Sequence, residues 1–390
     1  MSTFKGNFPD HKFVTADNFQ GKNRDSMVYF LSHLHDDHCL GLGSEAFHYK
    51  LKSDHRVTFI THCTTKDLIA MDSRYNHLKE FVTPVEYGLP QSLDVVDPVT
   101  GKTSYKLEFT LLDANHCPGS SMLKLKSNGK VSLYTGDFRD VMHSIFTTEK
   151  PEIDTLFLDT TFCIQKAMRF PTVSHSVASV IKLVDDWLKN ETMHVVYLEY
   201  SSRLGCEPIF FALRDYFNEE IHFSAEQRDI YDGIAETSRL SSRLSNVRIH
   251  AGMKQFKKNT VGIWSCRCDL DEKNVRVIGL SAQVFVRDCN REITPVKREG
   301  PNKYRVFYSR HSSVEELQKF TTYLCAKKIV PTASPGDKEL TNEMMRLISE
   351  FCISDRDYRP LGKVSSWQTE LRAKKRKLVE CSDDDLDFGE

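Results

Sequence analysis

The sequence lacks several features that would place the protein in a special class. No apolar run approaches the length of a membrane-spanning helix, and the opening residues Met1-Ser-Thr-Phe-Lys5 lack the apolar stretch of a signal peptide. The 11 cysteines are odd in number and lack the dense spacing of a disulfide framework. We therefore expect an intracellular protein, not bound to a membrane, whose cysteines are mostly reduced thiols.

A strong excess of charge of either sign is also missing. The formal net charge is −1, which neither favours nor excludes nucleic acid, because a local basic groove can coexist with an acidic remainder. Hydrophobic residues make up 40% of the 390 residues and charged residues 27%, as in folded proteins. The length predicts two domains, or one large domain with an insertion.

The first half of the chain predicts β-strands joined by short turns, and an α/β pattern follows. Asn128-Gly129 is typical of a tight hairpin. Runs rich in β-branched and aromatic residues predict strands, and apolar residues at helical spacing predict helices. The strands are expected at residues 27–32, 56–61, 105–112, 122–126, 131–134, 155–158 and 194–200, and the helices at residues 173–188, 207–217 and 314–324.

Opposed blocks of charge close the chain. Arg372-Ala-Lys-Lys-Arg-Lys377 is followed by Ser382-Asp-Asp-Asp-Leu-Asp387 without apolar periodicity. We therefore expect residues 364–390 to form a disordered charged tail. The basic block resembles a nuclear-import signal, and a solvated charged tail is an equally good interpretation.

A dense group of candidate metal ligands directly follows the first apolar strand. Four of them lie within six residues: His33, His35, Asp37 and His38. His116 and Asp137 each follow a later strand. A single buried histidine is usually a hydrogen-bonded core residue, but imidazole and carboxylate groups gathered at strand ends suit zinc and other divalent metals. The pattern predicts a metal centre with ligands for two adjacent ions.

The His-x-His-x-Asp-His pattern, followed by His116 and Asp137, resembles the metallo-β-lactamase superfamily. The resemblance implies an αββα sandwich whose loops bind one or two metals at one edge. Asp17 matches the first motif of that superfamily, where the resemblance implies that it orients a histidine ligand. A turn residue is the alternative interpretation of Asp17.

Two later segments, 158–163 and 308–313, resemble motifs of the β-CASP nucleases, which carry an α/β domain inserted into the lactamase fold. The segments 115–122 and 135–139 match the DNA-acting members of that group. The resemblance extends from Phe13 to Lys363, and the motifs at Asp159, His311 and 358–363 recur in the same order in one such member. It implies four parts: a first lactamase part at 1–165, the inserted β-CASP domain at 166–304, a second lactamase part at 305–363, and the tail at 364–390.

The same resemblance implies roles for individual residues. The first metal would be held by His33, His35, His116 and Asp137. The second would be held by Asp37, His38 and Asp137, with His311 completing its site. Asp159 would support a ligand across the domain junction, and a helix or turn cap is the alternative. The implied catalytic group is Asp17, Asp37, Asp159 and His311.

The inserted segment departs from its relatives in two places. Relatives carry a structural zinc on two histidines and two cysteines, and His222 and His250 occupy similar positions here, whereas Gly252 replaces one cysteine. Two interpretations remain open for this place. One is loss of the zinc, with His250 as a structural histidine, and the other is a rearranged site of His222, His250, Cys266 and Cys268.

The second departure concerns the grip on a terminal phosphate. Related 5′-exonucleases use a lysine where this chain has Cys206, at the end of Ser201-Ser-Arg-Leu-Gly-Cys206. Arg203 either supplies the positive charge that the lysine would provide or does not. Without that lysine, capture of a 5′-phosphate is in doubt, so the sequence favours an endonuclease over a 5′-exonuclease. Weak candidates for substrate contact are Ser201, Arg203, Ser312 and Ser313, and those for backbone phosphate are Lys254, Lys257, Lys258 and Arg287.

The resemblance as a whole implies a nuclear, metal-dependent DNA nuclease, acting as endonuclease or 5′-exonuclease on ends, overhangs or hairpins during repair such as double-strand-break end joining. The implied cofactors are one or two zinc ions, with Mg²⁺ or Mn²⁺ as alternatives for activity. The implied partners are DNA and a DNA-repair kinase complex. The alternatives are an RNA-processing β-CASP nuclease and a non-catalytic DNA-binding scaffold.

Overall fold

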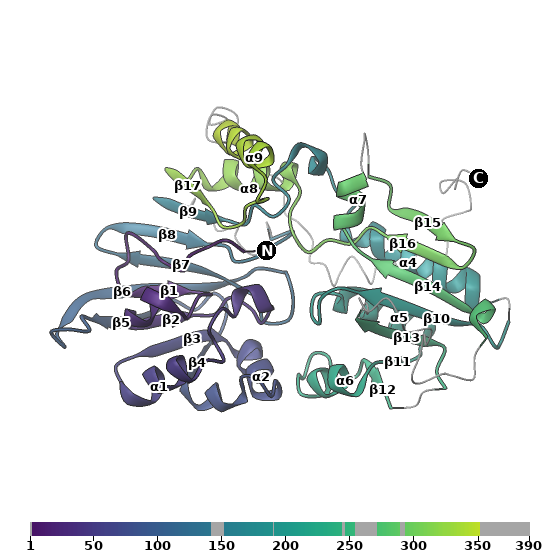
Figure 1. Ribbon diagram of the computed structural model, residues 1–390, viewed down its shortest axis with the longest axis horizontal. Helices are drawn as coiled ribbons and strands as arrows, with labels where there is room; N and C mark the ends of the chain where they lie inside the picture. Colours follow the sequence, from purple (N-terminus) through teal and green to yellow (C-terminus); the bar gives the residue numbers. More distant parts are fainter. Residues whose placement is uncertain are drawn as a thin grey trace.

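The computed structural model describes residues 2–141, 152–189, 191–243, 246–253, 271–288 and 293–351. Two parts lie side by side in Figure 1, each built on its own β-structure. The predicted tail at 364–390 lies outside the described residues. So do Cys266, Cys268 and the lysines at positions 254, 257 and 258.

Two sheets form the first part, which we call the sandwich. The smaller sheet is fully parallel in the order β1-β2-β3-β4, and the larger is mixed in the order β17-β9-β8-β7-β6-β5. The strands of the smaller sheet are Val14–Ala16, Val28–Phe30, Thr58–His62 and Val82–Val85. Those of the larger, β5 to β9 and then β17, are Gln91–Val96, Thr103–Asp113, Ser121–Ser127, Lys130–Tyr134, Thr155–Leu158 and Lys328–Pro331.

Three layers of buried side chains stack these sheets and their helices into the αββα arrangement predicted from the sequence. Phe30 and Leu125 belong to the layer between the two sheets. Phe47 and Ile69 pack helices α1 and α2 on the smaller sheet, and Leu317 packs α8 with α9 on the larger. Burial of this apolar surface is the main force that holds the layers together. The helices are α1 Glu45–Ser53, α2 Cys63–Met71, α8 Val314–Leu324 and α9 Lys338–Phe351.

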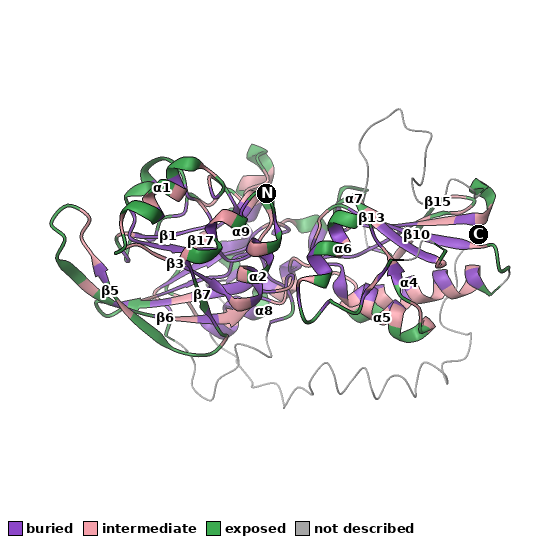
Figure 2. Cartoon of the chain, turned by 90° about the horizontal axis from the view of Figure 1, so that it is seen from below, coloured by how far each residue is buried: buried purple, intermediate pink, exposed green. Residues whose placement is uncertain are grey.

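The chain leaves the sandwich after β9 and returns to it at α8, and the residues between form the inserted domain. Its sheet has the order β12-β11-β13-β10-β14-β16-β15 and is parallel except for β15. Helices α4 and α5 cover one face over a core that includes Val180 and Phe210, as the buried residues in Figure 2 indicate. The strands β10 to β16 are Val195–Tyr200, Ile221–His222, Ser241–Ser242, Ile249–Met253, Val275–Leu280, Val296–Gly300 and Lys303–Val306. The helices α4 to α7 are Val173–Leu188, Glu207–Phe217, Ala225–Asp232 and Gln283–Asp288.

Short 3-10 helices occupy several connections. The second of them, η2, carries the end of the histidine-rich motif and therefore matters for the site. Their bounds, from η1 to η5, are Gly21–Asp25, Asp36–His38, Asn76–Phe81, Gln165–Ala167 and Glu272–Asn274.

The predicted hairpin joins β7 to β8 in antiparallel register, with Ser127 opposite Lys130. Its two central residues have φ values of 50° at Asn128 and 72° at Gly129. Positive φ at both positions suits the right-handed twist of the flanking strands, and asparagine and glycine adopt it at low cost. The turn fixes the register of β8, whose carboxyl end leads to Asp137.

Candidate metal centre

The histidine-rich motif begins where β2 ends, at the carboxyl edge of the parallel sheet. His33 and His35 lie in the segment after the strand, and Asp36–His38 forms η2. The backbone amide of His38 donates to the carbonyl of His35 at 3.0 Å, which closes this tight turn. The turn gathers three imidazole rings within a few residues, as ligand-bearing loops at strand ends commonly do.

His116 and Asp137 arrive from two strands of the larger sheet. The Ser120 hydroxyl accepts the backbone amides of His116 at 3.0 Å and Cys117 at 3.1 Å, which fixes the loop after β6. Gly136, with φ of 53°, precedes Asp137, and a Cβ there would lie 3.0 Å from Ser32 Cβ. Glycine therefore allows the Asp137 turn to approach the histidine-rich segment closely.

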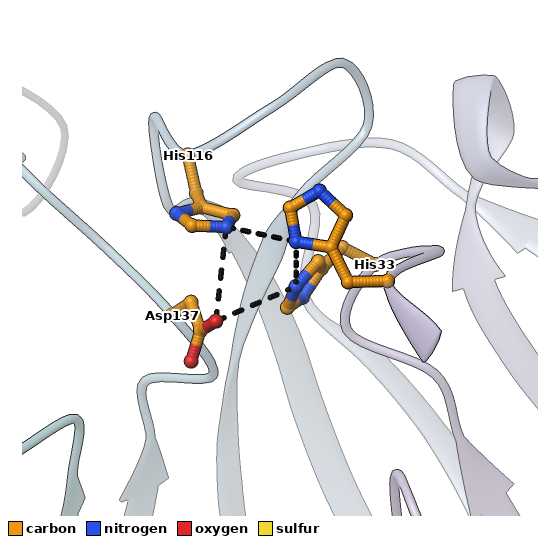
Figure 3. A group of neighbouring side chains, drawn as sticks. His33, His116 and Asp137 are labelled. Carbon is orange, nitrogen blue, oxygen red and sulfur yellow. Dashed lines mark hydrogen bonds and ion pairs between the residues drawn. The ribbon is translucent and has the colours of Figure 1, made fainter. Parts of the chain in front are cut away.

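Four of the predicted ligands converge on one point (Figure 3). His35 Nδ1 lies 3.1 Å from His33 Nε2 and 3.2 Å from His116 Nε2. Asp137 Oδ2 lies 3.6 Å from His33 Nε2 and 3.7 Å from His116 Nε2. Tetrahedral ligands about 2.0–2.1 Å from a zinc ion would be separated by about 3.3 Å. The observed separations therefore match those that a single divalent ion requires.

The hydrogen bonds on the far side of each ring decide which nitrogen carries the proton. The Leu204 carbonyl, 3.2 Å from His35 Nε2, and the Arg310 carbonyl, 3.0 Å from His116 Nδ1, can only accept, so these nitrogens are protonated. In the neutral rings the lone pairs of His35 Nδ1 and His116 Nε2 consequently face each other. Such an arrangement is repulsive without a cation between the nitrogens, which indicates a metal site.

A serine hydroxyl fixes the protonated nitrogen of the third ring, His33, in the same way. The Ser32 hydroxyl donates to Asp17 Oδ2 at 2.5 Å, so it accepts from His33 Nδ1 at 2.9 Å. His33 Nε2 is left with its lone pair toward His35. Burial lowers the pKa of His33 and His116 well below the usual value and also lowers that of His35. All three rings are therefore neutral at physiological pH, the form that binds metal.

Asp17 lies behind His38 and not among the converging ligands. Its carboxylate accepts from the Ser32 amide at 2.7 Å, from the Tyr134 hydroxyl at 2.6 Å and from His38 Nδ1 at 2.7 Å. These donors leave His38 Nε2 directed at Asp137 Oδ1, 3.3 Å away and without a hydrogen bond of good geometry. This geometry is what the predicted orienting role of Asp17 requires.

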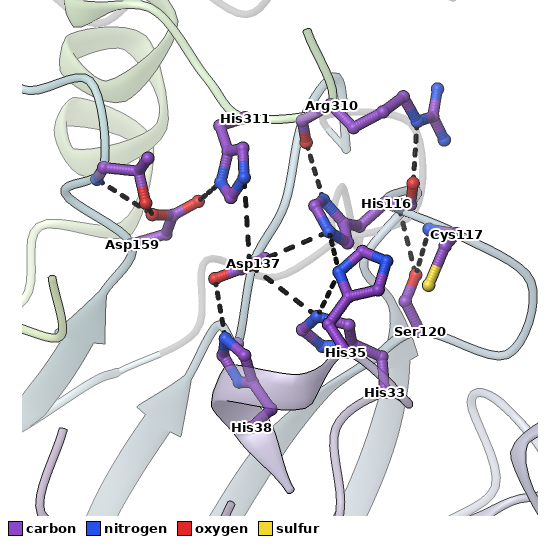
Figure 4. Close-up of polar contacts among 12 residues, drawn as sticks. His33, His35, His38, His116, Cys117, Ser120, Asp137, Asp159, Arg310 and His311 are labelled. Carbon is purple, nitrogen blue, oxygen red and sulfur yellow. Dashed lines mark hydrogen bonds and ion pairs between the residues drawn. The ribbon is translucent and has the colours of Figure 1, made fainter. Parts of the chain in front are cut away.

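A second group on the other side of Asp137 includes Asp159 and His311 (Figure 4). Asp159 Oδ2 accepts from His311 Nδ1 at 2.8 Å, so the ring presents Nε2 to Asp137 Oδ2 at 3.8 Å. Asp159 itself follows β9, and its Oδ1 also accepts from Thr161 at 2.7 Å. Asp159 thus holds a histidine toward Asp137, in the position that the resemblance implied.

The second predicted metal site is only partly assembled in this structure. His38 and His311 face opposite oxygens of Asp137, whose carboxylate is shared with the first site. Asp37 lines the same cleft, but neither group of converging ligands includes it. Its Oδ2 instead accepts the Ser2 backbone amide at 2.8 Å. The Asp37 side chain must turn from this contact to reach an ion held by His38.

The negative charge of Asp137 affects the pKa of the neighbouring histidines, and they affect its pKa in turn. Burial opposes ionisation of Asp137, but His38 and His311 outweigh it and hold the pKa of this carboxyl well below its usual value. Burial likewise disfavours the charged forms of His38 and His311, yet the adjacent carboxylates raise the pKa of both rings, that of His38 strongly. Protons and a second metal therefore compete for the same two rings.

The four weak candidates for substrate contact occupy different environments. Ser312 donates to the Phe138 carbonyl at 3.0 Å, and Ser313 caps α8 in a capping box with Glu316, so both are buried and used internally. Ser201 is exposed at the cleft. Arg203 Nη1 lies 3.6 Å from Asp72 and 3.3 Å from Glu226, which ties the inserted domain to the sandwich.

The candidate structural zinc site is described only in part. His222 and His250 lie opposite each other on β11 and β13, with ring centroids 5.0 Å apart, and His250 Nε2 lies 2.9 Å from the Val247 carbonyl. A Cβ at Gly252 would lie 2.2 Å from the Tyr197 hydroxyl, so Tyr197 would have to move to make room for the cysteine of the relatives. The rearranged site with the cysteines at 266 and 268 stays a prediction.

The chain is similar to known proteins of DNA repair. Residues 237–337 match the family model described as DNA repair metallo-beta-lactamase. The chain is 30% identical to protein artemis of Danio rerio over 408 residues, which cover 100% of this chain and 62% of the relative. Over its whole length the chain is therefore similar to DNA repair metallo-β-lactamases. The resemblance predicted from the motifs is thereby confirmed.

Further DNA-repair proteins are similar to this chain. Protein artemis of Homo sapiens is 27% identical over 404 residues, 99% of this chain and 57% of that protein. The DNA cross-link repair 1A protein of Mus musculus is 28% identical over 349 residues, 86% of this chain and 31% of that protein. The chain thus spans about six-tenths of the length of its artemis relatives. In its described part no helix combines the length and apolar character needed to cross a membrane.

The candidate metal centre borders a cleft between the sandwich and the inserted domain. The cleft has a volume of about 670 Å³ and is lined by both parts. His35, His116 and Asp137 line it on the sandwich side, together with Asp37. The cationic side chains that line the cleft are Arg74, Arg203, Arg287, Arg305 and Arg310.

Sequence reasoning assigned supporting roles to Asp17 and Asp159 but not to two arginines that also hold the ligand segments. Arg310 donates to the carbonyls of Asn115 and His116, and its own carbonyl holds the His116 ring. Arg139 is 1% exposed and donates to the Ser309 carbonyl at 3.0 Å, which links the Asp137 turn to the segment that carries His311. The only signal in the sequence was their position next to predicted ligands.

Proposed function

We propose that the chain is a metal-dependent nuclease that cuts DNA at ends, overhangs or hairpins. The observation that carries this proposal is the convergence of three histidine lone pairs and a carboxylate beside an open cleft. The family and the names of its members support DNA as the substrate class. We further propose nuclear localisation and a role in repair. A DNA-repair kinase complex as partner stays a prediction.

We propose zinc in the site of His33, His35, His116 and Asp137, because nitrogen and carboxylate donors at tetrahedral separations suit that ion. A second ion would be held between Asp137 and the rings of His38 and His311, with Mg²⁺ or Mn²⁺ as alternatives to zinc for activity. Metal ions held there would supply Lewis-acid chemistry for phosphodiester hydrolysis. The carboxylate of Asp137 holds both positions together.

The protein's own residues position the substrate and the ligands. Asp17 and Asp159 fix the rings of His38 and His311 by accepting their Nδ1 protons. Among the cleft arginines in ion pairs, Arg287 is the most open, with 74% of its side chain exposed, and we propose that it contacts the nucleic-acid backbone. The cleft thus combines the candidate metal ligands with an exposed cation.

The cleft favours internal cutting over capture of a 5′-phosphate. Cys206, at the position of the phosphate-binding lysine in related exonucleases, is buried at the start of α5 and provides no charge. The Arg203 guanidinium faces Asp72 and Glu226, which already balance its charge. We therefore propose that endonuclease activity dominates.

A panel of DNA substrates tests this function. The zinc-loaded chain, with Mg²⁺ or Mn²⁺ added in separate reactions, is incubated with 5′-phosphorylated, 5′-hydroxyl, overhang and hairpin DNA and with single-stranded RNA. We expect oligonucleotide products from overhangs and hairpins with either 5′ group. Single-nucleotide products that require a 5′-phosphate would instead establish an exonuclease. RNA cleavage without DNA cleavage, or binding without cleavage, would contradict the proposal.

The two metal positions should respond differently to acid. The pKa of His38 and His311 lies above 6.5, so at a pH below 6.5 protons occupy the ring nitrogens that a second ion would need. The pKa of His33, His35 and His116 lies below 6.5, so the first site keeps neutral ligands. On lowering the pH from about 8 to about 6, we expect the second ion to dissociate first. Metal stoichiometry after dialysis at each pH measures this order, and simultaneous loss of both ions would contradict it.

A further inference from the structure

A loop of the inserted domain reaches one of the candidate metal ligands across the cleft. The Ser202 hydroxyl lies 2.8 Å from His35 Nε2, and the Leu204 carbonyl lies 3.2 Å from the same nitrogen. Both residues belong to the segment between β10 and α5. Since the Leu204 carbonyl requires a proton on Nε2, the serine hydroxyl also accepts from that proton. The ring of His35 is thereby held with Nδ1 toward the other ligands.

The segment that presents Ser202 is itself held by buried contacts. The buried Glu207 carboxylate accepts the Gly205 amide at 2.7 Å and the Tyr231 hydroxyl at 3.1 Å. The Tyr308 hydroxyl donates to the Gly205 carbonyl at 2.8 Å. Gly205 has a φ of 112°, which a residue with a side chain rarely adopts. The loop is therefore a rigid support and not a surface segment that happens to lie near the ring.

The three histidines that follow β2, His33, His35 and His38, differ in where this support comes from. His33 and His38 are held from within the sandwich, by Ser32 and Asp17. His35 is held from the inserted domain, 167 residues away in the chain. A ligand whose far nitrogen is fixed by a hydrogen bond loses less freedom when it binds a metal, and such partners typically change affinity 10–100-fold.

We propose that Ser202 is a positioning residue for His35, so that the inserted domain contributes directly to metal affinity at the first site. This inference rests on the metal site of the proposed function. It assigns to the inserted domain a role beyond substrate contact, because the docked loop and the loaded metal site then stabilise each other.

Zinc affinity of the full chain tests the proposal. Metal-free wild type and variants are titrated with Zn²⁺ against a chromophoric chelator. Ser202→Ala removes the hydroxyl but leaves the Leu204 carbonyl, so we expect affinity to fall about tenfold, the lower end of the usual range for such partners. Ser202→Thr keeps a hydroxyl and should restore affinity. Ser201→Ala is the matched control, since Ser201 is exposed, and its affinity should equal that of wild type.

A spectroscopic readout separates positioning from general stability. Co²⁺ in the first site reports ligand geometry by its visible absorption, which we expect to change in Ser202→Ala and to stay the same in Ser201→Ala. Thermal unfolding of the metal-free variants should match that of wild type. Unchanged affinity and spectrum in Ser202→Ala would overturn the proposal, and so would a loss of affinity that Ser201→Ala shares. Failure of wild type to bind zinc would remove the proposed function as well, whereas zinc binding without DNA cleavage would remove the nuclease proposal only.

Discussion

Replacing Asp137 with asparagine should abolish DNA cleavage. Its Oδ2 faces His33, His116 and His311 and its Oδ1 faces His38, so it would contribute an anionic ligand to both metal positions. The amide keeps the shape but loses the charge that holds the ions. Metal catalysis supplies several kcal/mol of transition-state stabilisation, so we expect a fall in cleavage rate of at least about a thousandfold. Rate measurement on one hairpin substrate checks this.

Asp140→Asn is the matched control for this variant. Asp140 lies three residues later on the same loop, is exposed and has a φ of 56°, which asparagine tolerates well. We expect cleavage by Asp140→Asn to stay near the wild-type rate. Metal analysis should find fewer bound ions in Asp137→Asn than in Asp140→Asn. Equal metal content and equal cleavage in both variants would show that Asp137 is not the shared ligand.

Replacing Asp37 with asparagine should leave folding nearly intact and still abolish cleavage. The asparagine carbonyl oxygen can accept the Ser2 amide as Asp37 Oδ2 does, so the local structure keeps its hydrogen bond. The variant loses the anionic group that the family resemblance assigns to the second ion. We therefore expect about one ion per chain where wild type binds two, with thermal unfolding close to that of wild type.

The adjacent aspartate provides the control for Asp37. Asp36 pairs with Arg74 at 2.7 Å, but its side chain is 81% exposed, and exposed ion pairs contribute about 1 kcal/mol or less. Asp36→Asn should therefore keep both ions and near-wild-type cleavage. Wild-type cleavage by Asp37→Asn would overturn the second-site assignment and would leave the Ser2 contact as the role of this carboxylate.

Local patterns in the sequence predicted several elements of the fold. The strand 155–158 and the helices 173–188, 207–217 and 314–324 have the predicted bounds. The Asn128-Gly129 turn forms the predicted hairpin. These features depend on periodicity over a few residues and on backbone preferences, which the sequence states directly.

Several elements were not predicted. Helix α9 buries Met344, Leu347, Ile348 and Phe351 at helical spacing, but its remaining positions are polar, so only its packing on the larger sheet distinguishes it from a solvated segment. The short strands β1, β11 and β12 are similar cases. Their few residues become strands because of neighbours distant in the chain, and no local pattern reports such neighbours.

The candidate site shows the same division between local and distant information. The motif from His33 to His38 predicted candidate metal ligands, and the structure brings His33, His35, His116 and Asp137 together. The supports of the rings are distant in sequence: Ser202 for His35 and Arg310 for His116. Asp37 turns toward Ser2, a contact that spacing alone does not reveal. Ligand types are therefore readable from the sequence, whereas their orientation is not.

The central claim is that a divalent metal held by His33, His35, His116 and Asp137 is required for cutting DNA. The most direct measurement titrates zinc into metal-free wild type and determines, in the same samples, the bound metal and the rate of hairpin cleavage. The account predicts no cleavage without metal and a rate that rises with occupancy of the site. Cleavage that persists in the metal-free chain, or a fully loaded chain that leaves every DNA substrate intact, would contradict it.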